Sequence, residues 1–266
     1  GLGFIGINYL LLMSKVHKDD LFVCLDKMTY AANDPKILKC CENVKVIIGD
    51  ICDTKLVDEL FSRYHFDYVV NFAAESHVDN SLLSPLIFIK TNVEGTAVLL
   101  NAAVKYKVKK FHQVSTDEVY GEGKGNYLFK ESDKLNPSSP YSSSKAAADL
   151  LVLSYNRSFK LNVSISRSSN NYGLYQNKEK FIPNMIYNLL NKEKIHIYGD
   201  GNYTRDYLDV IDNVRAIDLI LRDNSETKIF NISSHQEILN IDLARKILKI
   251  FNYDDSMIEY VTDRKG

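Results

Sequence analysis

The sequence opens with Gly1-Leu-Gly-Phe-Ile-Gly6, which runs directly into the apolar helical stretch Ile7–Met13. Gly3 would let a pyrophosphate approach the backbone, and Gly6 would let a helix pack closely on a strand. The first turn of the helix would supply amide donors to the phosphates. The spacing therefore predicts a dinucleotide-binding turn. Because such a turn needs a strand ahead of it, we expect a longer chain of which this first strand is missing here.

An acidic residue stands at the separation that this turn requires. Asp26 follows the strand-like run Leu21–Leu25, about 20 residues after the glycines. Its carboxylate can accept hydrogen bonds from both hydroxyls of an adenosine ribose, and it would repel a 2′-phosphate. The glycine turn and Asp26 together favour NAD over NADP. The alternative is that Asp26 is a solvated aspartate at a strand end without a ligand.

Short β-branched runs alternate with longer stretches of helical period through the first two thirds of the chain. The predicted strands are Leu21–Asp26, Val44–Asp50, Tyr68–Ala73, Lys110–Thr116 and Val163–Arg167, and the predicted helices between them include Lys55–Tyr64, Ser84–Tyr106 and Tyr141–Phe159. Alternation of this kind is typical of an α/β fold with a doubly wound, parallel Rossmann-type sheet and helices on both faces.

The pattern becomes irregular after about residue 170. It contains short strands at Ile195–Tyr198 and Lys228–Ile232 and helices near Lys180–Leu190, Val210–Leu221 and Ile241–Phe251. We expect residues 1–170 to form the NAD-binding domain and residues 171–266 a smaller, mixed α/β substrate lobe, part of which returns to the sheet. Residues 262–266 end without a helix cap or a terminal strand, which again predicts a truncated chain.

Composition excludes several classes of function. The 33 basic and 34 acidic residues leave a net charge of −1, which gives no electrostatic reason for a nucleic-acid or anionic-membrane partner. Apolar runs fall short of the roughly 18 to 20 residues that span a bilayer, so we expect a soluble cytoplasmic protein. Cys24, Cys40, Cys41 and Cys52 show no metal-ligand spacing, and we expect reduced structural cysteines and no metal.

Two further strand ends fit a dinucleotide. Asp50 and Ile51 stand at the end of the predicted strand Val44–Asp50, where an aspartate could meet the adenine amine. The run Phe72-Ala-Ala-Glu-Ser76 ends the next one, where small residues leave room for a cofactor along the carboxyl edge of the sheet. Ligands of open α/β sheets bind at that edge.

Tyr141 and Lys145 lie four residues apart at the start of a predicted helix, so their side chains share one face. A nearby ammonium favours the phenolate and lowers the pKa of the phenol, which would let Tyr141 take a hydroxyl proton while a hydride leaves the same carbon. An incidental Tyr/Lys pair on a helix is the alternative.

The run Val114-Ser-Thr-Asp-Glu-Val-Tyr-Gly121 follows an apolar strand and therefore lies at its carboxyl end. Ser115 or Thr116 would bind a substrate hydroxyl and Tyr141. Mutual repulsion and burial of Asp117 and Glu118 would raise the pKa of at least one of them, which supplies a protonated acid beside an ionised base. Elimination of water needs that pairing.

These motifs resemble the dTDP-glucose 4,6-dehydratase family of the extended short-chain dehydrogenase/reductase superfamily. The resemblance also rests on Asp50-Ile-Cys-Asp53, Asn71-Phe-Ala-Ala-Glu-Ser-His-Val-Asp79 and Arg167-Ser-Ser-Asn-Asn-Tyr-Gly173, and it covers nearly the whole chain. Sugar 4-epimerases and nucleotide-sugar decarboxylases share the glycine turn and the Tyr/Lys pair. They lack the Asp-Glu pair after threonine, which makes that pair the most discriminating feature.

The resemblance implies that Tyr141 removes the C4 hydroxyl proton as NAD accepts the C4 hydride, with Thr116 orienting that hydroxyl and Lys145 assisting. Glu118 would then remove the C5 proton while Asp117 protonates the departing C6 hydroxyl, and the hydride would return to C6. The overall reaction is a lyase step in which NAD ends unchanged.

The resemblance also assigns contact positions. It implies a cofactor site made of Gly3, Phe4, Ile5, Gly6, Asp26, Lys27, Met28, Thr29, Asp50, Ile51, Phe72, Ala73, Ala74, Ser76, Thr91, Tyr141, Lys145 and Asn171. It implies substrate contacts from Ser76, Thr116, Asn170, Lys180, Phe181, His196, Ile197, Tyr198, Arg205 and Asn240. The guanidinium of Arg205 suits a diphosphate. The two long helices resemble those that pair two chains of this family, which implies a homodimer.

Two other functions remain open from the sequence. A nucleotide-sugar 4-epimerase would use Tyr141 in the same way but has no need of acid and base carboxyl groups near C5 and C6. A non-catalytic NAD- or sugar-binding sensor would need none of the five residues Thr116, Asp117, Glu118, Tyr141 and Lys145.

Overall fold

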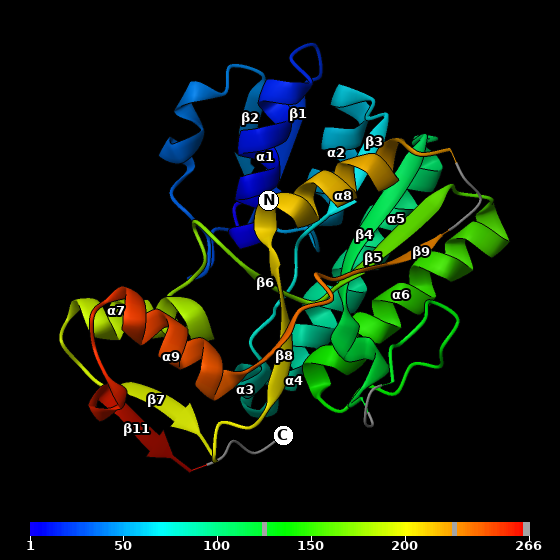
Figure 1. Ribbon diagram of the computed structural model, residues 1–266. Coiled ribbons are helices and arrows are strands. Elements are labelled where there is room, and N and C mark those ends of the chain that lie inside the picture. Colours follow the sequence, from blue (N-terminus) through cyan, green and yellow to red (C-terminus); the bar gives the residue numbers. More distant parts are fainter. Residues whose placement is uncertain (124–126, 225–227, 263–266) are drawn as a thin grey trace.

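The computed structural model describes residues 1–123, 127–224 and 228–262 (Figure 1). Four parallel strands form the larger sheet in the order β3 (Tyr68–Asn71), β4 (Lys110–Thr116), β5 (Val163–Ser168) and β9 (Ile229–Ile232). A parallel pair, β1 (Phe22–Asp26) and β2 (Val44–Ile48), continues this layer. The predicted α/β fold with a parallel sheet is confirmed, and each strand predicted before residue 170 lies within two residues of its observed bounds.

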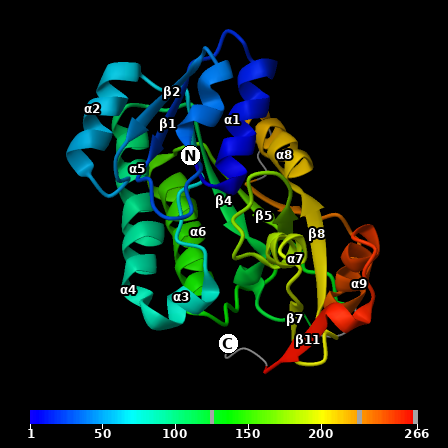
Figure 2. The same ribbon diagram turned by 90° about the vertical axis from the view of Figure 1, so that its left-hand side faces the viewer.

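Helices cover both faces of the strand layer, as Figure 2 shows. One face carries α1 (Phe4–Val16) and α8 (Val210–Arg222), and the other carries α2 (Thr54–Tyr64), α5 (Gly95–Lys105) and α6 (Pro140–Phe159). Separate buried clusters hold the two faces: Phe111, Val163 and Ile165 pack beneath α2, α5 and α6, whereas Val114 packs with α1 and α8. The sheet therefore has the two-sided packing that a doubly wound fold requires.

The predicted helix Ser84–Tyr106 is interrupted. Pro85 ends α3 (Val78–Leu83) and begins α4 (Pro85–Phe88), because proline suits the first turn of a helix. A π-helical turn, η2 (Ile89–Glu94), then joins α4 to α5. Single π-turns of this kind often occur at functional sites, and this one faces the cleft described below.

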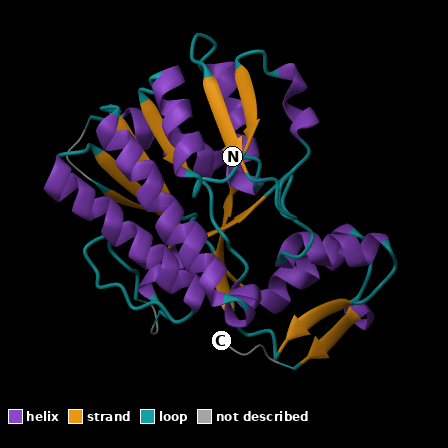
Figure 3. Ribbon diagram, turned by 180° about the vertical axis from the view of Figure 1, so that it is seen from behind, coloured by secondary structure: helices purple, strands orange, loops and turns teal. Residues whose placement is uncertain are grey.

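The C-terminal part crosses back over the sheet and also builds a smaller unit. Figure 3 shows α7 (Phe181–Leu190) and α9 (Asn240–Ile250) beside the strand pair β7 (Ile195–Tyr198) and β11 (Ile258–Val261). A three-stranded sheet of β6 (Asn170–Tyr172), β8 (Thr204–Asp209) and β10 (Glu237–Leu239) connects this unit to the larger one. The sequence analysis missed β6, β8, β10 and β11, because three to six residues without clear alternation carry little strand signal.

Short helical turns complete the described chain. They are the 3₁₀ turns η1 (Pro35–Cys40), η3 (Asp117–Tyr120) and η4 (Asp255–Met257). All four cysteines are unpaired, and no group of metal-ligating side chains occurs within the described ranges. None of the described helices is both long enough and apolar enough to cross a bilayer. Most of the predicted irregular end, residues 262–266, lies outside the described residues.

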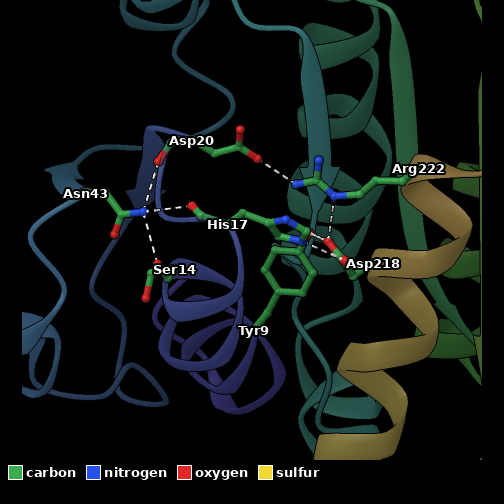
Figure 4. A network of polar contacts seen from close by, with 7 residues as sticks. All are labelled: Tyr9, Ser14, His17, Asp20, Asn43, Asp218 and Arg222. Atoms are coloured by element: carbon green, nitrogen blue, oxygen red, sulfur yellow. Dashed lines mark hydrogen bonds and ion pairs between the residues drawn. The ribbon is translucent and has the colours of Figure 1, made fainter.

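A polar network fixes α8 to the N-terminal helix (Figure 4). The Asp218 carboxylate on α8 accepts hydrogen bonds from Tyr9 Oη at 3.3 Å and Arg222 Nε at 3.2 Å, and it lies 2.9 Å from His17 Nε2. Arg222 also pairs with Asp20 at 2.6 Å. The network therefore binds residues about 200 positions apart and holds the helix that follows the glycine turn.

Loss of the Asp218 carboxylate should destabilise the fold. We expect Asp218→Ala to lower the free energy of unfolding by about 2 to 4 kcal/mol, because it leaves Tyr9 and His17 without this acceptor and Arg222 with Asp20 as its remaining acidic partner. Asp212 lies on the same helix but pairs with Arg215 only at the surface, at 3.4 Å. Asp212→Ala should therefore change stability by less than about 0.5 kcal/mol. Urea unfolding compares the two variants, and equal losses would contradict the role of the network.

Candidate active site

One cleft runs along the carboxyl ends of the strands and has a volume of about 330 Å³. This is within the range of small-molecule sites. Of the residues predicted from sequence, it is lined by Gly3, Phe4, Ile5, Gly6, Asp26, Lys27, Thr29, Asp50, Ile51, Phe72, Ala73, Ala74, Ser76, Thr91, Thr116, Asp117, Glu118, Tyr141, Lys145, Asn170, Asn171 and Lys180. The structure thus gathers residues from nine separate chain segments at one edge of the sheet.

The glycine turn forms one end of the cleft, where α1 begins at Phe4. A Cβ atom added to Gly3 would meet no atom within 4 Å, so this backbone is open toward the cleft. A Cβ atom on Gly6 would lie 2.3 Å from the carbonyl oxygen of Gly1. Only glycine therefore lets α1 approach the turn, and the amide groups of its first turn remain available to an anion.

Asp26 ends β1 beside this turn. Its Oδ2 accepts from the Leu2 amide at 2.7 Å, and its Oδ1 accepts from the Met28 amide at 2.8 Å. Burial raises the pKa of Asp26, and the hydrogen bonds from the Leu2 and Met28 amides act in the opposite direction. An ionised carboxylate fixed by backbone amides suits the hydroxyls of a ribose. Met28 itself does not line the cleft.

Lys27 and Asp50 close the same end. Lys27 Nζ lies 2.7 Å from Asp50 Oδ2. Burial raises the pKa of Asp50, yet the hydrogen bonds from Lys27 and from the Cys52 amide hold it below its usual value. The two side chains join the ends of β1 and β2, next to the position where the sequence predicts the adenine.

The π-helical turn η2 supports the middle of the cleft. Asn92, which is buried, accepts from the Glu75 amide at 2.9 Å and donates to Ser144 Oγ at 2.8 Å. Thr91 precedes it and lines the cleft. The turn thus connects the end of β3 to the catalytic helix α6, and a regular helix at this point would direct Asn92 elsewhere.

Thr116, Asp117 and Glu118 lie where β4 ends and η3 begins. Thr116 Oγ1 accepts from the Glu118 amide at 3.2 Å and so caps η3. It also donates to Asp117 Oδ1 at 3.3 Å. Gly121 ends η3 with φ 83°, and a Cβ atom there would lie 2.3 Å from the Asn136 carbonyl oxygen. The tight turn presents both carboxyl groups to the cleft.

The two carboxyl groups have raised pKa values. Burial raises the pKa of Asp117 to about 6, although Thr116 and Arg205 act against it. Burial and the neighbouring Asp117 raise the pKa of Glu118, and Lys180 and Arg205 lower it. The sequence predicted such a rise, and the structure adds Arg205 as a cation that acts on both groups. Two carboxyl groups with raised pKa values thus lie side by side, an arrangement that suits one acid and one base.

Tyr141 and Lys145 occupy the first turns of α6. This helix begins with a capping box in which Ser139 Oγ accepts from the Ser142 amide and Ser142 Oγ accepts from the Ser139 amide. Both catalytic candidates are buried, and Lys145 Nζ donates to the Val114 carbonyl oxygen at 2.7 Å. Burial lowers the pKa of Lys145 to about 8, against the effect of Asp149.

The prediction that the pKa of Tyr141 is lowered is wrong for this structure, in which it is raised. Burial and then the Glu118 carboxylate raise the pKa of the phenol, and only the hydrogen bond with Thr116 lowers it among the leading contributions. The physical reason is that burial disfavours the phenolate and that the nearby carboxylates Glu118, Asp117 and Asp149 disfavour it further. An added positive charge in the cleft would be needed to favour the phenolate.

Several predicted substrate residues lie away from the cleft lining. Phe181 begins α7, Arg205 lies on β8 and Asn240 begins α9, and His196, Ile197 and Tyr198 belong to β7. His196 is exposed and lies 3.5 Å from Glu259, whereas Ile197 is fully buried in the core of the small unit. The Ile197 side chain therefore packs the core instead of facing a ligand.

A segment along the cleft is here called the strap and is defined as residues 174–180, of which only Lys180 was predicted from the sequence. Asn8 Nδ2 donates to the Leu174 carbonyl oxygen at 2.9 Å, Tyr30 Oη donates to Glu179 at 3.3 Å, and Lys180 Nζ donates to the Ser76 carbonyl oxygen at 3.2 Å. Missed lining residues are Ala31, Ala32, Ser168, Ser169, Gln176, Asn177 and Glu179. The end of β5 could have indicated Ser168 and Ser169, but no local pattern marks the strap.

Comparisons with known proteins agree with this site. The sequence model of a family described as GDP-mannose 4,6 dehydratase matches residues 1–263. The dTDP-glucose 4,6-dehydratase of Mycolicibacterium smegmatis is 41% identical over 268 residues, which cover 100% of this chain and 80% of that protein. The low-salt glycan biosynthesis protein Agl12 of Haloferax volcanii is 42% identical over 271 residues, with 100% and 85% covered.

Solved structures extend the comparison. The dTDP-glucose 4,6-dehydratase DesIV of Streptomyces venezuelae, crystallised with NAD and a second ligand, has a TM-score of 0.94 and 37% identity over 99% of this chain and 83% of that chain. The UDP-glucose 4-epimerase of Thermotoga maritima has a TM-score of 0.92 and 29% identity over 100% and 85%. These relatives confirm the resemblance to dTDP-glucose 4,6-dehydratases that the sequence motifs indicate. The family model and the relatives together show that this chain belongs to the GDP-mannose 4,6 dehydratase family.

Proposed function

We propose that this chain is an NAD-dependent nucleotide-sugar 4,6-dehydratase that converts dTDP-glucose to dTDP-4-keto-6-deoxyglucose and water. The observation that carries the proposal is the Asp117–Glu118 pair, which lines the same cleft as Tyr141 and has raised pKa values. Relatives named dTDP-glucose 4,6-dehydratase, and their solved structures with NAD, support the substrate and the cofactor.

The residues at one end of the cleft fit NAD. The open backbone at Gly3 and the first turn of α1 would hold the pyrophosphate, and Asp26 would accept hydrogen bonds from the adenosine ribose. Thr91 and Asn171, both on the lining, would contact the cofactor farther along. When bound, NAD supplies the acceptor for the C4 hydride and returns that hydride to C6.

Tyr141 is the base of the first step. Its phenolate takes the C4 hydroxyl proton while Thr116, which shares a hydrogen bond with it, orients that hydroxyl. Burial and the Glu118 carboxylate raise the pKa of Tyr141, so positive charge supplied to the cleft when NAD is bound would favour its phenolate. The substrate thereby becomes a C4 ketone, which makes the proton on C5 acidic.

Glu118 and Asp117 then divide the elimination between them. Glu118, ionised, takes the proton from C5, and Asp117, protonated near its pKa of about 6, gives its proton to the C6 hydroxyl, which leaves as water. The double bond forms between C5 and C6 as the C6–O bond breaks. Return of the hydride to C6 and of a proton to C5 completes the product.

Basic side chains would hold the rest of the substrate. Lys180 lines the cleft, and Arg205 lies close enough to lower the pKa values of both carboxyl groups. A guanidinium binds phosphate oxygens through two parallel hydrogen bonds, which suits Arg205 to the diphosphate. Ser76 and Asn170 would contact the sugar, and Phe181, His196, Tyr198 and Asn240 would line a more distant nucleotide pocket.

The epimerase reading has one supporting observation, the similar fold of a UDP-glucose 4-epimerase. An epimerase needs Tyr141 but gains nothing from two carboxyl groups beside it. A binding protein without activity has no use for a lysine buried beneath a buried phenol. The Asp117–Glu118 pair therefore favours dehydration over both.

We also propose a homodimer and a cytoplasmic location. An apolar surface, made of Leu83, Leu86, Leu150 and Phe159, is exposed on α3, α4 and α6, with Leu83 83% and Leu86 81% exposed. Exposed apolar side chains on these three helices suit burial against a second copy of the chain. The location stays a prediction from the sequence.

Turnover tests the central proposal. Incubation of the protein with NAD and dTDP-glucose in deuterated water should give a 4-keto-6-deoxy product labelled at C5, because Glu118 exchanges the C5 proton with solvent. Mass spectrometry and NMR measure the label. A 4-epimer without loss of water would support the epimerase, and no dehydrated product from dTDP-, UDP-, CDP- or GDP-glucose would sink the proposal.

The acid role of Asp117 has its own test. Asp117→Asn removes the proton donor but keeps the shape, so elimination should slow about 100-fold or more while C4 oxidation changes less than about 3-fold. The absorbance of reduced nicotinamide reports C4 oxidation, and formation of the 4-keto-6-deoxy sugar reports elimination. Equal losses in both steps would contradict the assignment.

The dimer can be tested at its surface. Leu83→Glu should weaken self-association about 100-fold or more, because it places a charge in an apolar interface. Leu219, which is 72% exposed on α8, offers a matched control, and Leu219→Glu should leave association unchanged. Sedimentation equilibrium measures both, and an unchanged Leu83→Glu variant would place the interface elsewhere.

A further inference from the structure

One carboxylate outside the reacting centre fastens three separate segments of the chain. Asp206 lies on β8, the middle strand of the sheet that connects the two units (Figure 1). Its Oδ1 accepts from Ser169 Oγ at 2.5 Å and from the Ser234 amide at 3.0 Å. Its Oδ2 accepts from Ser234 Oγ at 3.0 Å and from the Gln236 amide at 2.9 Å. Asp206 therefore joins the end of β5 and the loop of residues 233–236, here called the β9–β10 loop, to β8.

Each of these three segments carries a predicted substrate contact. The contacts are Asn170, which follows Ser169, Arg205, which precedes Asp206, and Asn240, which follows the strand that the β9–β10 loop enters. Within the described residues, Asn240 Oδ1 is buried and has no hydrogen-bond partner, so it is an acceptor that a ligand could use. One carboxylate thus lies where the supports of three contacts meet.

The β9–β10 loop has a conformation that needs such a support. His235 has φ 56°, which lies in the left-handed region that residues with a side chain rarely adopt. The amides of its two chain neighbours, Ser234 and Gln236, both donate to Asp206. After this turn β10 pairs with β8 in a register that places Ile238 opposite Arg205. The carboxylate therefore holds the turn that brings β10, and then α9, beside Arg205.

Asp206 suits this task because a carboxylate only accepts. Burial raises its pKa, but the hydrogen bonds from Ser169, Ser234 and Gln236 hold the pKa below its usual value. An ionised carboxylate has about four acceptor positions, and the four bonds above use them. The residue is absent from the lining of the cleft, so its carboxylate serves the protein and not a ligand.

We propose that Asp206 is a positioning residue for the nucleotide-sugar, which holds Asn170, Arg205 and Asn240 in the arrangement that binds the substrate. The inference rests on the proposed function, which assigns these three residues to the substrate. The catalytic carboxyl groups lie on η3, and the glycine turn with Asp26 lies at the other end of the cleft. Loss of Asp206 should therefore weaken substrate binding while NAD binding and the chemical steps persist.

Binding of dTDP measures this effect without turnover. In Asp206→Asn the side-chain amide must face the Ser234 amide or the Gln236 amide, and two donors then repel each other. By isothermal titration calorimetry, dTDP should bind the NAD-loaded variant about 10-fold or more weakly, with the Kd of NAD changed less than about 2-fold. Asp209→Asn on the same strand is the matched control. Asp209 accepts from the Ile211 amide at 2.7 Å, which asparagine does equally well, so both affinities should persist.

Steady-state kinetics separate positioning from folding. With dTDP-glucose, Asp206→Asn should raise KM about 10-fold or more and change kcat less than about 3-fold, because the lost contacts act equally on substrate and transition state. A merely structural role would lower the amount of folded protein and leave the KM of the folded fraction unchanged.

A milder variant covers the case in which Asp206→Asn does not fold. Ser234→Ala removes the hydroxyl that donates to Asp206 and accepts from the Gln236 amide at 3.1 Å, and it should raise KM about 3-fold. Circular dichroism confirms folding of each variant.

Wild-type dTDP affinity in a folded Asp206→Asn protein, or in Ser234→Ala where the first variant is unfolded, would overturn the inference. Weaker binding by the variant of a protein that forms no dehydrated product would refute only the proposed function. Wild-type protein that binds none of dTDP, UDP, CDP and GDP would overturn both.

Discussion

The central strand β4 must satisfy its polar groups without water, and much of the molecule is arranged around that requirement. All seven of its residues are buried, although five are polar. Lys110 donates to the last carbonyl groups of α8, and His112 bonds Ser164 and Ser166 on β5 at 2.8 and 3.0 Å. Buried polar groups are costly unless paired. These pairings therefore fix α8 and β5 against the strand that carries the active site.

The same strand supplies the catalytic groups with their positions. Its Val114 carbonyl oxygen holds Lys145, and its last residue, Thr116, caps the turn that presents the two carboxyl groups. Burial of these ionisable groups also shifts their pKa values in directions that suit the proposed reaction. It raises the pKa of Asp117 into the range of a useful acid and lowers that of Lys145 toward neutrality.

Much of this was predictable from sequence, for reasons of period and spacing. A parallel sheet brings the carboxyl ends of its strands to one edge. The sequence therefore indicates that the glycine turn, Asp26 and the strand ends belong to one site. The spacing of Tyr141 and Lys145 likewise predicts their shared face. The roles assigned to Thr116, Asp117 and Glu118 remain proposals, but their common location in the cleft agrees with the sequence reading.

Contacts between residues far apart in the chain could not be predicted from the sequence. The sequence does not reveal that Tyr141 is buried beside the Glu118 carboxylate, so the predicted direction of the Tyr141 pKa shift was wrong. Nor does any periodicity indicate the π-helical turn η2, which arises where Asn92 reaches across to Glu75 and Ser144. Irregular segments of this kind are decided by tertiary contacts, which local propensity does not contain.

The strap has a kinetic consequence. It lies along the cofactor end of the cleft and is fastened there by Asn8, Tyr30 and Lys180, mostly through backbone carbonyl oxygens. A dinucleotide beneath it could exchange with solvent only after several of these bonds had opened together, which makes departure slow. In a reaction that restores its oxidant within every cycle, slow departure costs no turnover. The nicotinamide would then behave as a resident group, with the sugar nucleotide as the only molecule that must come and go.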